Sequence, residues 1–348
     1  MSERINLPDL LKGIAVVLMV QVHLTELFIE DSFLSSQIGK LSLFFGGVPA
    51  APLFMTVMGF FLLYIPKPVS LNLKRGIKLI FLGFMLNGGI NLHLFVNIFF
   101  RGWAIDPLPY FFGVDILFLA GFSVIVISLL NKFFPNNAFL FFLLALIFSA
   151  SSTIIPVYSG DSYCIRVPLA YIHSYDWWSY FPIIPWMAYP FAGASVALVI
   201  RKNRFVIEHH YKKPFLLIIP LAIVFVFWSF GYKVSSDLFS YYHHGVRFFI
   251  WAIMLLLVFT SLVYFLDNAV SNKNLMKRYL LWTGKNVTAF YVVQWLIIGN
   301  LATSLYKSQS PLVLPLWLIA VLAVSSLVVR FWRYIISQHL PNSNPKNH

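Results

Sequence analysis

A succession of apolar runs, each about twenty residues long, is the feature that most constrains how this chain can fold. A membrane-spanning helix needs roughly 20 such residues. The chain is 59% hydrophobic and 11% charged, which is more apolar sequence than a soluble core can bury. We expect an all-α, polytopic membrane helix bundle of about ten transmembrane helices. The expected spans are residues 9–29, 41–64, 75–93, 111–131, 138–156, 181–200, 214–231, 245–266, 280–305 and 311–336.

The distribution of positive charge predicts how these spans are oriented. The formal net charge is +13, but Lys and Arg cluster in short segments between apolar runs, so we expect no nucleic-acid partner. Most basic residues fall on one side of the alternating spans. The other side carries only Lys40, Arg101, Arg166, Lys233, Arg247 and Lys307. The positive-inside rule therefore places both termini in the cytoplasm.

The remaining organisation is simple. We expect one transmembrane domain over residues 1–340 and a short polar cytoplasmic tail over 341–348. The first apolar run lacks a signal-peptide cleavage pattern, so we interpret it as a retained helix. The single cysteine, Cys164, has no Cys/His cluster around it, and we expect no metal site.

The first span, PDLLKGIAVVLMVQVHLTE, carries ionisable groups that a lipid-facing helix does not need. At the helical period, one face of it collects Asp9, Lys12, Val16, Met19, His23 and Glu26. Lys12 and His23 are roughly 16 Å apart along this face, about half of the hydrocarbon core. Lys12 is thus expected near the cytoplasmic edge and His23 deeper in the membrane.

The order Asp9, Lys12-Gly13 and His23 resembles the opening helix of transmembrane acyltransferases, where an Arg-Gly is followed by ten residues and a His. It is similar to the large family that modifies surface polysaccharides. Four further segments resemble the heparan-α-glucosaminide N-acetyltransferase-like branch. They are APLFMTVMGFFL (51–62), VDILFLAGFS (114–123), FPIIPWMAYPFAGASVAL (181–198) and TGKNVTAFYVVQWLI (283–297).

The resemblance implies a roughly ten-helix fold that takes an acyl group from cytoplasmic acyl-CoA and delivers it to an external acceptor, often a sugar. Lys12 stands where the family has Arg. A lysine keeps the positive charge but lacks the planar guanidinium that makes bidentate contacts.

The candidate catalytic residues are His23, Glu26 and Asp115. The ordinary pKa of a histidine lies near 6.5, so His23 suits a base that deprotonates the acceptor, or a carrier of the acyl group. Glu26, one turn away, would orient the imidazole, or else is a solvated acid at the external mouth. Asp115 would contact the acceptor or His23, or else close the bundle by pairing with Arg247.

The expected donor is acetyl-CoA or another acyl-CoA, whose phosphates need cations. The candidates lie at the cytoplasmic ends of spans and are Lys12, Lys74, Arg75, Lys78, Arg201 and Lys202. For each residue other than Lys12 the alternative is the positive-inside rule alone. Lys12 at i+3 from Asp9 is equally explained by an interfacial ion pair.

The candidates for acceptor binding are Asn87, Trp186, His243 and Arg247. Pro182 and Pro185 predict a broken helix start beside Trp186, which is tolerated next to a cavity and makes Trp186 a candidate cavity wall. The alternative for Trp186 is an aromatic-belt anchor. His243 lies in an external aromatic cluster that faces substrate or the membrane interface. Gln294 and Asn91 are further polar residues inside predicted spans.

Three function classes follow. The first is a multi-pass acyltransferase, an O- or N-acetyltransferase of a bacterial inner membrane, acting on a glycan or similar acceptor. The second is a transporter or flippase with an intramembrane His/Asp/Arg relay, which predicts broken helices in matched positions of two repeated halves. The third is a non-catalytic scaffold. The sequence leaves the oligomeric state open, a homodimer included.

Overall fold

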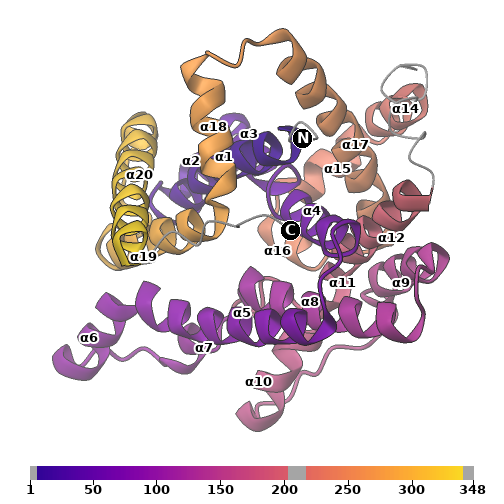
Figure 1. Ribbon diagram of the computed structural model, residues 1–348. Helices are drawn as coiled ribbons and strands as arrows, with labels where there is room; N and C mark the ends of the chain where they lie inside the picture. Colours follow the sequence, from indigo (N-terminus) through magenta and orange to yellow (C-terminus); the bar gives the residue numbers. More distant parts are fainter. Residues whose placement is uncertain (1–5, 203–216, 340–348) are drawn as a thin grey trace.

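The computed structural model describes residues 6–202 and 217–339, and this part of the chain is helical without any β-strand (Figure 1). The predicted tail 341–348 lies outside the described residues. The helices in chain order are α1 (Leu7–Leu27), α2 (Asp31–Ser35), α3 (Gln37–Gly47), α4 (Ala51–Tyr64), α5 (Val69–Ile90), α6 (Leu92–Arg101), α7 (Leu108–Phe111), α8 (Ile116–Phe133), α9 (Ala138–Ser151), α10 (Tyr163–Ile172), α11 (Ile183–Trp186), α12 (Ala188–Lys202), α14 (Ile218–Val226), α15 (Trp228–Ser235), α16 (Leu238–Tyr242), α17 (Val246–Ala269), α18 (Leu275–Lys285), α19 (Val287–Leu305), the 3-10 turn η2 (Pro311–Val313) and α20 (Leu314–His339).

The chain is a multi-pass membrane protein. Seven helices or helix runs in the described residues are long and apolar enough to cross a membrane, or up to nine if each of two bent pairs counts as one span. The bent pairs are α5 with α6, at 55°, and α14 with α15, at 69°. The expected count of ten spans is therefore not confirmed. The predicted span 138–156 contains only the 14-residue helix α9, which at 1.5 Å per residue reaches about 21 Å.

Helix α1 occupies the centre of the bundle. It packs against α3, α4, α17, α18, α19 and α20. A lipid-facing helix carries apolar side chains on all its faces. Helix α1 instead buries residues on most sides, and its ionisable side chains point inward. Helix α20, by contrast, stands at the periphery beside α19 (Figure 1). The sequence feature that marked α1 as unusual thus reflects its central position.

Two glycines let α18 approach the first half of α1. A Cβ at Gly13 would overlap the backbone of Leu280, and one at Gly284 would overlap the backbone of Asp9. Small residues at a crossing allow two helices to pack backbone to backbone in a membrane protein. This reciprocal contact fixes the end of α1 that bears Lys12.

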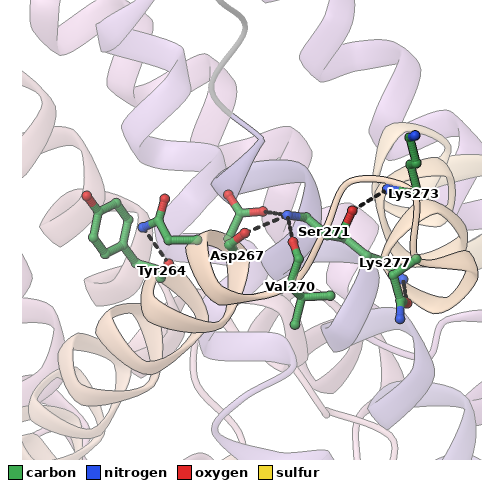
Figure 2. A network of polar contacts seen from close by, with 8 residues as sticks. Tyr264, Asp267, Val270, Ser271, Lys273 and Lys277 are labelled. Atoms are coloured by element: carbon green, nitrogen blue, oxygen red, sulfur yellow. Dashed lines mark hydrogen bonds and ion pairs between the residues drawn. The ribbon is translucent and has the colours of Figure 1, made fainter.

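A buried lysine ties α17 to α18 (Figure 2). Lys277 is 6% exposed, and its Nζ lies 2.7 Å from a carboxylate oxygen of Asp267. The same ammonium donates to the main-chain carbonyls of Asp267 (2.5 Å) and Val270 (2.8 Å) at the carboxyl end of α17. One cation thus satisfies a carboxylate and two carbonyls that the helix end leaves unpaired.

Replacing Lys277 with methionine should lower the thermal midpoint of the detergent-solubilised protein. Removing one partner of a buried ion pair leaves the other charge unpaired, at a cost of about 3–5 kcal/mol, which is roughly 5–10 °C here. Lys273→Met is the matched control, because it removes a neighbouring charge on an exposed residue. Among the described residues, the contact of Lys273 with this region is the hydrogen bond that its backbone N–H donates to the Ser271 hydroxyl. An equal midpoint for both variants would show that the network does not stabilise the fold.

The loop before α8 is held by the segment that follows α10. Val114 donates its N–H to the carbonyl of Trp178 (2.8 Å) and accepts from the N–H of Phe181 (3.0 Å). Tyr171 of α10 donates to the carbonyl of Phe112 (3.0 Å). These contacts position the next residue, Asp115, at the start of α8.

Candidate active site

A large cavity runs along α1. Its volume is about 1010 Å³, at the top of the roughly 300–1,000 Å³ range for small-molecule sites. At one end it is lined by Lys12, Lys67 and Arg75, and at the other by Trp103 and Tyr306. From the predicted stripe of α1, Lys12, Met19, His23 and Glu26 all line it. Four of the six residues of that predicted face therefore border the cavity.

His23 is held by two consecutive residues of α19. Its Nδ1 lies 3.4 Å from Oε1 of Gln294, and its ring lies against the Trp295 ring with centroids 3.9 Å apart. Gln294 is fully buried, and its Nε2 donates to the carbonyl of Tyr291 (3.3 Å). This orientation of the amide leaves Oε1 as an acceptor, so Nδ1 of His23 carries the proton. Nε2 of His23 is then the free basic nitrogen on a residue that lines the cavity.

Helix α19 presents one chemical face to this site. Tyr291, Gln294 and Trp295 are related as i, i+3 and i+4, which places them on the same side of the helix. Sequence reasoning picked out Gln294 as an intramembrane amide but missed Tyr291 and Trp295. The segment YVVQW does place polar and aromatic residues at helical spacing. Aromatic side chains at that spacing are equally typical of a hydrophobic core, so the pattern alone did not indicate a site.

Asp115 joins α8 to α19 at the cavity. One of its carboxylate oxygens accepts from the N–H of Leu117 (2.6 Å), which caps the amino end of α8. The other oxygen accepts the hydroxyl proton of Tyr291. Asp115 and Tyr291 both line the cavity. Both oxygens of the Asp115 carboxylate are therefore already hydrogen-bonded at the cavity. The hydrogen bond with Tyr291 fixes that side chain one turn before Gln294.

Asn87 supports Asp115 rather than presenting free donors. Its amide nitrogen donates to the carbonyls of Phe111 (2.9 Å) and Gly113 (2.8 Å). Asn91, at the bend between α5 and α6, donates to the carbonyls of Asn87 (3.0 Å) and Tyr110 (3.2 Å). Asn87 and Asn91 line the cavity, but both amide N–H groups of Asn87 are engaged in holding the loop that precedes Asp115.

Glu26 and Lys12 stand on either side of His23 along α1. Glu26 lines the cavity one turn further along α1, and within the described residues the hydrogen-bond partner of His23 is Gln294 rather than Glu26. Lys12 forms an ion pair with Asp9 (2.8 Å) while its side chain keeps 22% exposure. Lys12 is thus both an ion-pair partner and a cavity-lining cation.

The other residues expected to bind the donor fall into three groups: one lines the cavity, two line a second pocket, and two lie at the end of α12. Arg75 lines the cavity, as does Lys67, which sequence reasoning passed over because it looked like an ordinary topology charge. Lys74 and Lys78 line a separate pocket along α5, of about 390 Å³, to which Arg75 also contributes.

The last two expected donor-binding residues lie at the end of α12. Arg201 donates to the carbonyl of Leu63 (2.9 Å) near the end of α4, and neither it nor exposed Lys202 lines the cavity. Arg204, the next basic residue, lies outside the described residues.

The remaining expected acceptor-binding residues lie outside the cavity lining. Trp186 is fully buried, donates to the carbonyl of Tyr242 (2.8 Å) and packs behind Phe181, which does line the cavity. His243 packs on the rings of Tyr175 and Phe239, and burial lowers its pKa to about 4. Arg247 is exposed at the start of α17.

No three His, Cys, Asp or Glu side chains among the residues of the described ranges are grouped so as to hold a metal ion. The charged and polar residues that line the cavity come from several elements, among them α1, α5, α19 and the connection between α4 and α5 that carries Lys67.

Comparison with known proteins gives one match. The family model described as an acyltransferase domain covers residues 5–332, nearly the whole chain. No curated protein and no solved structure matches significantly. The matched range includes the central helix with His23, both walls of the cavity and the α19 face that holds the imidazole. The chain therefore belongs to acyltransferase family 3, a family of membrane acyltransferases.

Proposed function

We propose that this protein moves an acyl group from cytoplasmic acyl-CoA to a hydroxyl or amine of an extracytoplasmic acceptor, with a glycan as the expected acceptor and a bacterial inner membrane as the location. The observation that carries the proposal is His23, placed within a continuous cavity and held through Nδ1 by Gln294. Family membership supports acyltransferase activity.

The donor is assigned to the end with Lys12, Lys67 and Arg75. Three cations at one mouth of the cavity match the phosphates of coenzyme A. In this proposal the thioester extends from that end along the cavity toward His23. The opposite mouth is rich in aromatic side chains, among them Trp103, Tyr110 and Trp177, and it receives the acceptor.

The proposed reaction uses His23 Nε2 as a general base. It takes the proton of the acceptor hydroxyl or amine as that group attacks the thioester carbonyl carbon. The tetrahedral intermediate collapses with cleavage of the C–S bond, and the imidazolium returns the proton to the coenzyme A thiolate. In the alternative two-step route, Nε2 attacks the thioester carbonyl carbon, the C–S bond breaks and coenzyme A leaves as its thiolate. The acceptor then attacks the acyl group, the bond to Nε2 breaks, and the acceptor's proton passes to Nε2 and on to the thiolate.

Purified protein in liposomes tests this proposal against transport. Acetyl-CoA is supplied on one side, and an oligosaccharide mixture prepared from the surface glycans of non-expressing cells is supplied on the other. Release of free coenzyme A thiol that requires the oligosaccharide supports the enzyme. Accumulation of acetyl-CoA or oligosaccharide across the bilayer without thioester loss would support a transporter instead. Mass spectrometry then locates the added acyl group on the acceptor.

A further inference from the structure

The two walls of the cavity differ sharply in polarity. Every lining residue contributed by α3, α4 and their connection is apolar, from Leu43 to Ile65. The facing wall from α5, α8 and α19 contributes Asn72, Asp115 and Tyr291 among other polar groups. A polar acceptor gains hydrogen bonds on the second wall and would lose them on the first. The apolar wall is suited to the hydrocarbon part of a substrate.

The apolar wall reaches the level of the reacting group. Gly46, near the end of α3, packs so closely on Val22 that a Cβ at Gly46 would overlap the Val22 side chain. Val22 precedes His23 directly on α1, and both residues line the cavity. A carbonyl carbon positioned for His23 therefore has the apolar wall beside it.

Behind Gly46 the wall continues in a part of the lining that we call the recess. Its members are Gly47, Leu238 and Tyr241, all of which line the cavity. The hydroxyl of Tyr241 donates to the carbonyl of Gly47 (3.0 Å). The nearby hydroxyl of Ser235 donates to the carbonyl of Gly231 (2.8 Å). With both hydroxyls engaged, the recess presents a ring, a leucine side chain and the main chain of a glycine.

Gly47 is a glycine where packing does not demand one. A Cβ there would meet its nearest neighbour, the Tyr241 ring, at 3.5 Å, an ordinary van der Waals distance, and the backbone is not left-handed. Fixing an alanine at the end of a helix loses less conformational entropy on folding than fixing a glycine there. The missing side chain instead leaves volume in the recess.

We propose that this recess holds the tail of an acyl chain longer than acetyl, so that the protein prefers such acyl-CoA donors to acetyl-CoA and Gly47 limits the chain length that fits. The proposal rests on the proposed function, because it names the acyl class of the same donor. Each buried methylene should tighten donor binding roughly fourfold.

Calorimetric titration of the purified protein in nanodiscs with acetyl-, butyryl- and hexanoyl-CoA tests the proposal without an acceptor. For the natural chain we expect butyryl-CoA to bind roughly 15-fold more tightly than acetyl-CoA, with hexanoyl-CoA at least as tight as butyryl-CoA. Gly47→Leu should weaken hexanoyl-CoA at least tenfold and leave acetyl-CoA within about twofold. Gly47→Ala, which fits without displacement, should weaken hexanoyl-CoA by two- to threefold.

Gly88→Ala is the matched control, because its Cβ would meet nothing within 4 Å and Gly88 does not line the cavity. Equal affinity of the natural chain for all three donors, or an equal loss of all three in Gly47→Leu, would overturn the acyl recess. Absence of binding by every acyl-CoA would instead overturn the donor assigned under the proposed function. The thermal midpoint of each variant reports whether it folds.

Discussion

His23→Ala is expected to lose acyl transfer by a factor of at least 10²–10⁴ while the protein still assembles as a folded bundle. General-base assistance contributes a factor of this size. The substitution removes one hydrogen bond to Gln294 and the contact with Trp295, a modest structural change. The measurement is acceptor-dependent release of coenzyme A thiol, with the thermal midpoint as the folding check.

His93→Ala is the matched control for that experiment. His93 is also a hydrogen-bonded histidine of the bundle, with Nδ1 3.1 Å from the carbonyl of Asn300, but it does not line the cavity. Transfer should therefore survive in His93→Ala. Full transfer activity in a folded His23→Ala variant would contradict the assignment of the base.

An experiment on the natural chain separates the one-step route from the two-step route. The natural chain is mixed with acetyl-CoA in the absence of acceptor, quenched and digested. A mass increase of one acetyl group on the peptide that contains His23 supports the acyl carrier, and coenzyme A release that waits for acceptor supports direct transfer.

Gln294→Ala is expected to lower kcat by about 10–100-fold and to leave the KM for acyl-CoA within about twofold. Gln294 is fully buried and does not line the cavity, so it acts through His23 rather than on substrate. Loss of its carbonyl oxygen frees the imidazole to change tautomer and to rotate, and supporting groups of this kind typically contribute 10–100-fold.

Asn300→Ala provides the matched control on the same helix. Its amide nitrogen donates to the carbonyls of Gly89 and Leu296, both at 2.8 Å, so its loss also removes side-chain hydrogen bonds from α19. Both variants should lose stability, but only Gln294→Ala should lose kcat. If kcat falls equally in the two, Gln294 supports the fold and does not position His23.

The first helix shows how far sequence reasoning reaches. The apolar run, its ionisable residues and the helical period were enough to place Lys12, Met19, His23 and Glu26 on one face, and all four line the cavity. The period of a helix is a local property, so it can be counted along the chain. The partner of His23 cannot be counted in this way, because Gln294 follows it by 271 residues.

Residues of the same type also acquire different roles that the sequence does not distinguish. Arg75 and Arg201 both lie at the ends of spans, yet Arg75 lines the cavity and Arg201 bonds the carbonyl of Leu63. Trp186 follows a proline-rich break as expected for a cavity wall, but it lies one layer behind Phe181. The rotation of each helix about its axis decides such cases, and that rotation is set by packing.

By itself, the sequence determined a multi-span helical membrane protein whose first helix faces the interior, because apolar length and charge spacing act on each segment separately. The tertiary structure alone decided which spans are bent, which cations reach the cavity and which nitrogen of His23 is free. Those properties depend on contacts between α1, α8 and α19, and such contacts form only when helices distant in the chain pack together.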